Sequence, residues 1–207
     1  MRLLAGIVGV TLLSAALPAS AETIRFAILR DGTQIGTHVI EINRAGPETS
    51  VKIATDLEVK VLFVTAYQLK HTATERWVDG RLVALKSSTN NNGTRHSVAV
   101  NETSAGVEIK ADGKAANADK SLMPGSLWNP ELLRRSVMLD SQEGTIRQLS
   151  VVDHGLAQVT VKGRVVKARR YTLKSKWEQD VWYDEQSRLV HAQLIASDGS
   201  VISYQLL

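Results

Sequence analysis

The sequence contains no cysteine among its 207 residues. The fold therefore cannot depend on disulfides, and zinc sites built on thiolates and cysteine nucleophiles are excluded. A lipid-modified N-terminal cysteine is excluded for the same reason. Beyond residue 21 there is also no apolar run near the about 20 residues that a membrane-spanning helix needs, so we expect no transmembrane segment there.

Motifs that carry catalysis are also missing. There is no Gly-x-Ser-x-Gly nucleophile turn and no glycine-rich phosphate loop, and no two of the five histidines stand at metal-ligand spacing. His71 and Glu75 share one strand face but lie about 13 Å apart along it. We therefore predict a protein that is not an enzyme and holds no metal or cofactor. An enzyme of another type would need His71 or His154 to cluster with carboxylates in a pocket.

Charge of either sign is not concentrated enough to indicate a nucleic-acid partner. The formal net charge is +4, which is mildly basic and well short of the positive charge expected of nucleic-acid-binding domains. We predict no nucleic acid among the partners.

The first residues resemble a secretory signal. Arg2 precedes an apolar run, Leu3–Leu17, and small residues follow at Ala19 and Ala21. This arrangement predicts a cleavable signal peptide over residues 1–21, with cleavage after Ala21 and a periplasmic location in a Gram-negative bacterium. A retained N-terminal anchor is the alternative.

The remainder, residues 22–207, has the length of a single domain. Apolar side chains recur with period two through most of it, which indicates antiparallel strands. Asp-Gly or Asn-Gly pairs separate many of these segments and predict tight hairpins. The run Val61-Leu62-Phe63-Val64 is apolar without interruption, which predicts a strand covered on both faces. We expect strands near residues 24–28, 34–40, 51–61, 66–77, 81–88, 97–101, 107–111, 144–152, 158–161, 165–173, 179–183, 189–196 and 201–206.

Residues 111–121 are small and polar and predict a loop. One helix is then expected at Pro130–Leu139, because Asn129 suits an N-cap and Pro130 suits the first helical position. We expect Trp128, directly before this cap, to anchor the helix across the sheet opening. Together these features predict a mainly β fold: a single strongly curved antiparallel sheet or open half barrel with one covering helix.

Several motifs carry a family resemblance. They include Trp128-Asn129-Pro130-Glu131, Arg170-Tyr171-x-Leu173 and Asp180-Val181-Trp182-Tyr183-Asp184. With these motifs the chain resembles an uncharacterised family of exported bacterial proteins, a domain of unknown function. The Trp-Tyr-Asp hairpin is also similar to one in the LolA/LolB-like lipoprotein-carrier superfamily, which implies a half-open barrel around a cavity for acyl chains. The chain lacks that superfamily's N-terminal helix and offers only one helix for a lid.

Two sets of side chains are candidate binding residues. Aromatic residues on several strands can line one concave face and accept an apolar or lipid-like ligand, or they can fill a core. A basic stretch without acidic residues can dock on an anionic envelope surface, or it can be a solvated strand face. The aromatic candidates are Phe63, Tyr67, Trp77, Trp128 and Trp182, and the basic candidates are Lys162, Arg164, Lys167 and Arg169.

Two hypotheses about function follow. The first is a non-enzymatic periplasmic binding or carrier protein that holds an apolar or lipid-like ligand on the concave face. The second is a structural or interaction protein of the cell envelope, with a filled core and a basic docking face. They differ in whether the concave face is open or packed.

Overall fold

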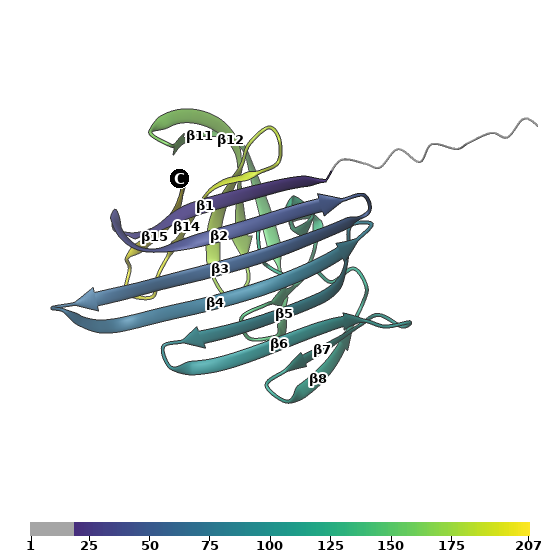
Figure 1. Ribbon diagram of the computed structural model, residues 1–207. Helices are drawn as coiled ribbons and strands as arrows, with labels where there is room; N and C mark the ends of the chain where they lie inside the picture. The colour runs from purple at the N-terminus through teal and green to yellow at the C-terminus, as the bar shows by residue number, and fades with distance from the viewer. Residues whose placement is uncertain (1–18) are drawn as a thin grey trace, which may run out of the picture.

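The computed structural model of the protein describes residues 19–207 (Figure 1). Most of the predicted signal peptide lies outside the described residues, and the first strand begins at Ser20, just before the predicted cleavage site. The elements are β1 (Ser20–Arg30), β2 (Thr33–Ala45), β3 (Glu48–Val61), β4 (Val64–Val78), β5 (Arg81–Asn91), β6 (Thr94–Glu102), β7 (Val107–Ala111), β8 (Lys114–Ala118), η1 (Pro130–Arg134), β9 (Val137–Asp140), β10 (Thr145–Gln148), β11 (Ser150–Val161), β12 (Arg164–Lys174), β13 (Glu178–Tyr183), β14 (Leu189–Ile195) and β15 (Val201–Leu206).

One antiparallel sheet contains 13 of these strands. Its order is β11-β12-β13-β14-β15-β1-β2-β3-β4-β5-β6-β7-β8, so the first and last strands of the chain are neighbours. The described sheet ends at β11 and β8 and is not closed into a barrel. The predicted mainly β, antiparallel fold is confirmed at this level.

The predicted tight turns are also present. Asp31-Gly32, Asp79-Gly80 and Asn92-Gly93 each place two successive residues at positive φ, the conformation of a type I′ hairpin turn. The loop expected at residues 111–121 is wrong in part. Asp112-Gly113 forms another such turn, and it pairs β7 with β8.

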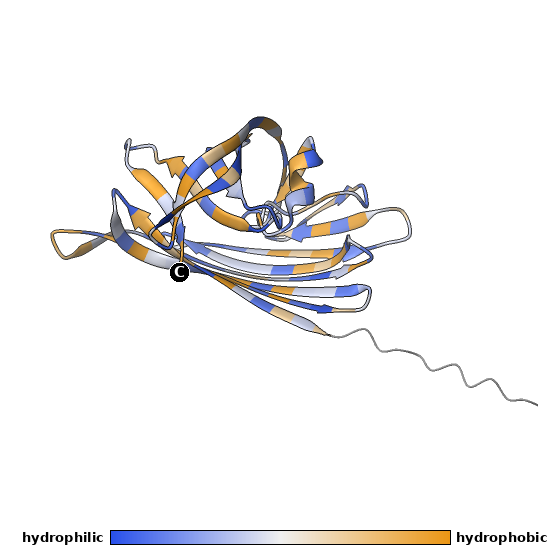
Figure 2. Cartoon of the chain, turned by 90° about the horizontal axis from the view of Figure 1, so that it is seen from above, coloured by the Kyte–Doolittle hydropathy of each residue, from blue (hydrophilic) through white to orange (hydrophobic). Residues whose placement is uncertain are grey.

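Alternation along the strands places the core on one face of the sheet. In β4, the side chains of Leu69, His71, Ala73, Glu75 and Trp77 are buried, and the residues between them are exposed. This face, the inner face, is covered by the segments that follow β8, which lie on one side of β1–β8 (Figures 1 and 2). Glu75 and His71 thus occupy positions that the period-two pattern reserves for apolar residues.

The predicted α-helix at Pro130–Leu139 is wrong. Asn129 does cap the segment, accepting a bond from the Glu131 N–H at 3.1 Å, but only a 3₁₀ helix, η1, follows. Arg135 is already extended, and Val137–Asp140 pairs with β10 instead of continuing the helix. The backbone of Leu139 bonds to Met123 and Gly125, so sheet-like bonds replace helical ones. Tertiary packing has overridden a local helix signal.

We refer to residues 119–136, which run from the end of β8 to the start of β9, as the covering segment. It crosses the inner face and carries Trp128 and η1. Within the described part of the chain, no helix has both the length and the apolar character needed to cross a bilayer.

Candidate functional site

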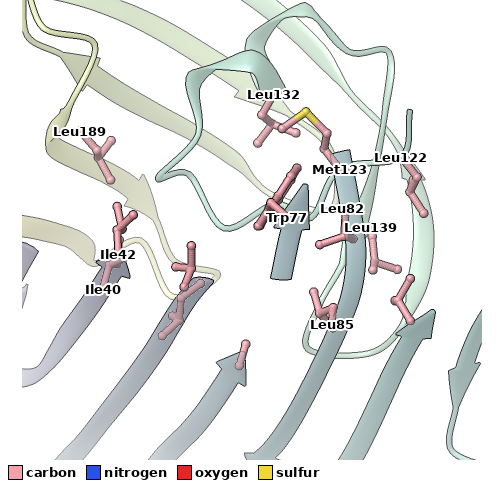
Figure 3. Packing of buried hydrophobic residues seen from close by; sticks show 14 of the residues in the cluster. Ile40, Ile42, Trp77, Leu82, Leu85, Leu122, Met123, Leu132, Leu139 and Leu189 are labelled. Carbon is pink, nitrogen blue, oxygen red and sulfur yellow. The ribbon is translucent and has the colours of Figure 1, made fainter. Parts of the chain in front are cut away.

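Trp77 and Trp128 are the two predicted ligand-binding residues that the structure brings together. Their rings meet edge to face, with centroids 5.5 Å apart and planes at 87°. Trp77 is buried on β4 and faces Leu132 and Met123 of the covering segment (Figure 3). Trp128 therefore anchors the covering segment to β4, although the helix it was expected to anchor is a single 3₁₀ turn.

A buried carboxylate lies between the two tryptophans. The indole N–H groups of Trp77 and Trp128 both donate to Oε2 of Glu75, at 2.9 and 2.8 Å. Oε1 of Glu75 has no hydrogen-bond partner among the described residues. We call Glu75, Trp77 and Trp128 the Glu75 centre.

The environment of Glu75 favours its neutral form. Burial raises the pKa of its carboxyl, while the two indole donors and a weaker interaction with Ser126 act in the opposite direction. Since Oε2 accepts both indole bonds, the proton of the neutral acid is placed on Oε1. A neutral acid without an adjacent base suits a structural link between sheet and covering segment.

The inner face around this centre is packed. The core cluster joins residues from both halves of the sheet and from the covering segment, and Leu132 and Leu139 have 1% and 0% of their surface exposed. Two hollows, of about 380 and 350 Å³, lie over β4–β6 and beside the start of β1. None of the five predicted aromatic residues lines either hollow.

The other three aromatic candidates lie apart from this centre. Tyr67 packs against a small separate cluster that contains Leu57 and Leu69. Trp182 is buried in a third cluster, its ring 4.9 Å from that of His191. Phe63 is 99% exposed at the turn between β3 and β4. The five residues therefore do not form one binding surface.

The turn around Phe63 corrects the prediction of a covered strand at Val61–Val64. Val61 and Val64 close a hairpin, and all four residues are exposed: Val61 52%, Leu62 88%, Phe63 99% and Val64 68%. Leu62 and Phe63 have φ of 49° and 68°. Left-handed backbone costs an L-residue about 1–2 kcal/mol, and neither side chain is packed in return. We call Val61–Val64 the apolar tip.

The basic candidates belong to the β11–β12 hairpin. Lys162 lies in its turn, and alternation places Lys167 and Arg169 on one face of β12 and Arg164 on the other. Arg169 forms an ion pair with Asp153 at 2.5 Å. The four cations are near one another in the chain but are divided between two faces, and one is partly neutralised.

Three of the histidines follow one row across the inner face. His38, Thr55, His71, Thr89 and His96 are successive register partners on β2–β6. Nδ1 of His38 lies 2.8 Å from the hydroxyl of Thr55, and Nδ1 of His71 lies 2.9 Å from that of Thr89. Burial lowers the pKa of His71 and lowers that of His38 to about 4. Hydroxyl partners satisfy these rings without activating them as bases.

His154 reaches a carboxylate only indirectly. Its Nε2 lies 2.8 Å from the Thr172 hydroxyl, which donates to Asp180 at 2.5 Å. Asp180 also pairs with Arg170 at 2.6 Å. Neither hollow includes these residues. Within residues 19–207, no three histidine, aspartate or glutamate side chains gather as metal ligands would.

Sequence reasoning missed both the Glu75 centre and the apolar tip. The alternation of β4 does place Glu75 on the buried face, and this position was the available signal for a buried acid. Nothing local paired it with Trp128, which is 53 residues away. For the tip, the uninterrupted apolar run predicts a covered strand, and Leu62 and Phe63 are uncommon turn residues that give no turn signal.

The family model described as a domain of unknown function, DUF6134, matches residues 26–207. The fold is similar to that of a solved beta-barrel-like protein of the domain of unknown function DUF1849 from Brucella abortus, with a TM-score of 0.67 and 9% identity over 93% of this chain and 98% of that chain. At this identity the similarity shows the fold alone.

No curated protein matches the chain. The predicted similarity to LolA/LolB-like carriers is not shown by these comparisons and stays a prediction, whereas the predicted membership of a family of unknown function is confirmed. Because the family model covers most of the sequence, the chain belongs to the DUF6134 family, a domain of unknown function.

Proposed function

We propose that this chain is an exported, non-enzymatic interaction protein of the cell envelope that acts through its surface. The packed inner face carries the proposal. The Glu75 centre joins the covering segment to β4 at the place where a carrier would hold its ligand. Several of the exposed apolar residues lie instead at hairpin ends, including the apolar tip.

The proposed location rests on the signal-like sequence over residues 1–21. Fractionation of cells expressing the full chain tests it, together with N-terminal sequencing of the recovered protein. We expect periplasmic protein that begins at Glu22. An uncleaved protein in the membrane fraction would support the retained anchor.

The packed inner face is tested by the fluorescence of the buried and half-buried tryptophans. A Trp177→Phe variant removes the tryptophan that is 58% exposed, so the remaining signal comes from Trp77, Trp128 and Trp182. We expect no saturable quenching by a doxyl-labelled fatty acid, and a native mass spectrum without bound lipid. One-to-one quenching or one bound lipid per chain would contradict the proposal.

That contradicting result would favour the second candidate, a carrier of an apolar or lipid-like ligand. One observation supports it: the inner face is closed by the covering segment, which has only five residues of 3₁₀ helix. Movement of this segment would expose the apolar inner face.

The basic stretch is the docking face that the sequence predicts for an interaction protein. Changing Arg164, Lys167 and Arg169 together to Glu reverses its charge. A partner bound there is lost from this variant and kept by a Lys110→Glu control in β7, distant in the sheet order from β12.

A further inference from the structure

We propose that the apolar tip inserts into the interfacial region of a lipid bilayer, an inference that rests on the proposed surface-acting function and names its partner. The tip is the end of a hairpin that projects from the sheet. Pairing of β3 with β2 ends at Leu57, and pairing of β4 with β5 begins at Leu69. Four residues of β3 (58–61) and five of β4 (64–68) lie beyond these pairs, and four paired residues at about 3.3 Å each make an extension of about 13 Å. Figure 1 shows it reaching beyond the neighbouring turns.

The surface of this hairpin is divided into an apolar end and a polar collar. Val61–Val64 carries only apolar side chains, which Figure 2 shows as the orange end of the longest hairpin. Directly behind it, Thr65 donates to Glu58 at 2.6 Å and Lys60 pairs with Glu58 at 3.1 Å. The apolar end spans about 5–7 Å, which matches the 5–10 Å depth to which apolar side chains enter the interface. The collar then lies at the headgroups.

Charge distinguishes this surface from an electrostatic docking site. The two lysines nearest the tip, Lys60 and Lys70, are paired with Glu58 and Asp56. The tip itself is uncharged. Its attraction is therefore to hydrocarbon and does not require anionic lipid.

Exposure and backbone geometry favour lipid over a protein groove. Leu62 and Phe63, at 88% and 99% exposed, are open on all sides, as suits a fluid medium that surrounds the tip. Both also hold left-handed backbone where Asn-Gly would be the unstrained choice. A turn selected for stability alone has no use for these two residues, and strained backbone of this kind points to function.

The test uses the full chain expressed in cells and the recovered protein mixed with phosphatidylcholine vesicles, with and without phosphatidylglycerol. We expect cosedimentation with both, unchanged in about 1 M salt, where the screening length is about 3 Å. Because the chain has no cysteine, Phe63→Cys takes a single environment-sensitive dye. Its emission should shift to the blue with vesicles, whereas a dye on Asp79→Cys, at the other end of β4, should not respond.

The decisive variant replaces Leu62 with Asn and Phe63 with Gly. It removes the apolar side chains and supplies the residues that the turn prefers, so vesicle affinity should fall at least about tenfold while the urea midpoint rises. Leu156→Asn, which removes another exposed apolar side chain, is the matched control and should bind like the unchanged protein.

Four results would overturn the inference. They are absence of vesicle binding, binding that needs phosphatidylglycerol and disappears in salt, equal binding by the Asn-Gly variant, and a dimer that this variant converts to a monomer. The last would identify a second copy as the partner. None of these four bears on whether the inner face is packed, which the fatty-acid quenching measures separately, so the two proposals can fail independently.

Discussion

The Glu75 centre gives a prediction about pH. An unfolded glutamate ionises near its ordinary pKa of 4.5, whereas burial raises the pKa of Glu75 in the folded protein. Well below pH 4.5 both states are protonated, so the ionisation of Glu75 does not change the free energy of unfolding. As pH rises from there towards the folded pKa, only the unfolded state loses its proton, so the folded state loses stability by as much as about 1.4 kcal/mol per pH unit.

Glu75→Gln removes this dependence because its amide oxygen still accepts both indole bonds but does not titrate. Urea unfolding followed by tryptophan fluorescence, from about pH 4 to 8, gives the free energies. Relative to that of the unchanged protein, the free energy of unfolding of the variant should increase by up to about 1.4 kcal/mol for each pH unit as the pH rises. Glu75→Leu should instead cost about 2–6 kcal/mol, since two buried N–H groups each lose an acceptor worth about 1–3 kcal/mol.

Glu48→Gln, at an exposed position at the start of β3, is the control for the loss of one carboxylate. If the difference in free energy of unfolding between Glu75→Gln and the unchanged protein does not change with pH, Glu75 is ionised in the folded protein. The assignment of a neutral buried acid would then be wrong.

Three further predictions concern single residues. Trp128→Phe removes one of the two donors to Glu75 and should lower the free energy of unfolding by about 1–3 kcal/mol; an unchanged urea midpoint would contradict the role of that bond. His38 has a folded pKa of about 4 against 6.5 when unfolded, so the protein should lose up to about 3 kcal/mol as pH falls through this range, and melting curves of His38→Gln should lack that loss. Gly36→Ala would place a Cβ 2.2 Å from the carbonyl oxygen of Asp56 and should destabilise by about 1–3 kcal/mol or more, while Thr37→Ala, at the exposed neighbouring position of β2, is its comparison in the same assay.

The strands and turns were predictable from sequence because their signals are local. Alternation in β3 and β4 persists over more than ten residues, and Asp79-Gly80 between β4 and β5 marks its turn directly. The pairing of β15 with β1 has no such signal, because no short turn joins the two strands.

The errors arose where contacts distant in sequence decide the local conformation. Pro130–Leu139 has a proper cap and apolar spacing, yet Leu139 bonds to Met123 and Gly125 in strand fashion. A covered strand and an exposed apolar hairpin end have the same composition at Val61–Val64. The Glu75 centre depends on Trp128, which only the folded chain brings to β4.

The pairing of β1 with β15 has a consequence for how the chain folds. In the 13-stranded sheet, β11–β15 stand in chain order and are followed by β1–β8, also in chain order. Every neighbouring pair of strands except β15 and β1 is therefore consecutive in the chain. The amide of Leu207 bonds to Arg25, close enough to β1 for a short linker of about six residues to join the ends. A circular permutant opened after β8 would then run through the whole sheet as an uninterrupted meander from β11 to β8. Its contact order would fall, and it should fold faster than the natural connectivity, in which β1 must wait for the last strand to be made.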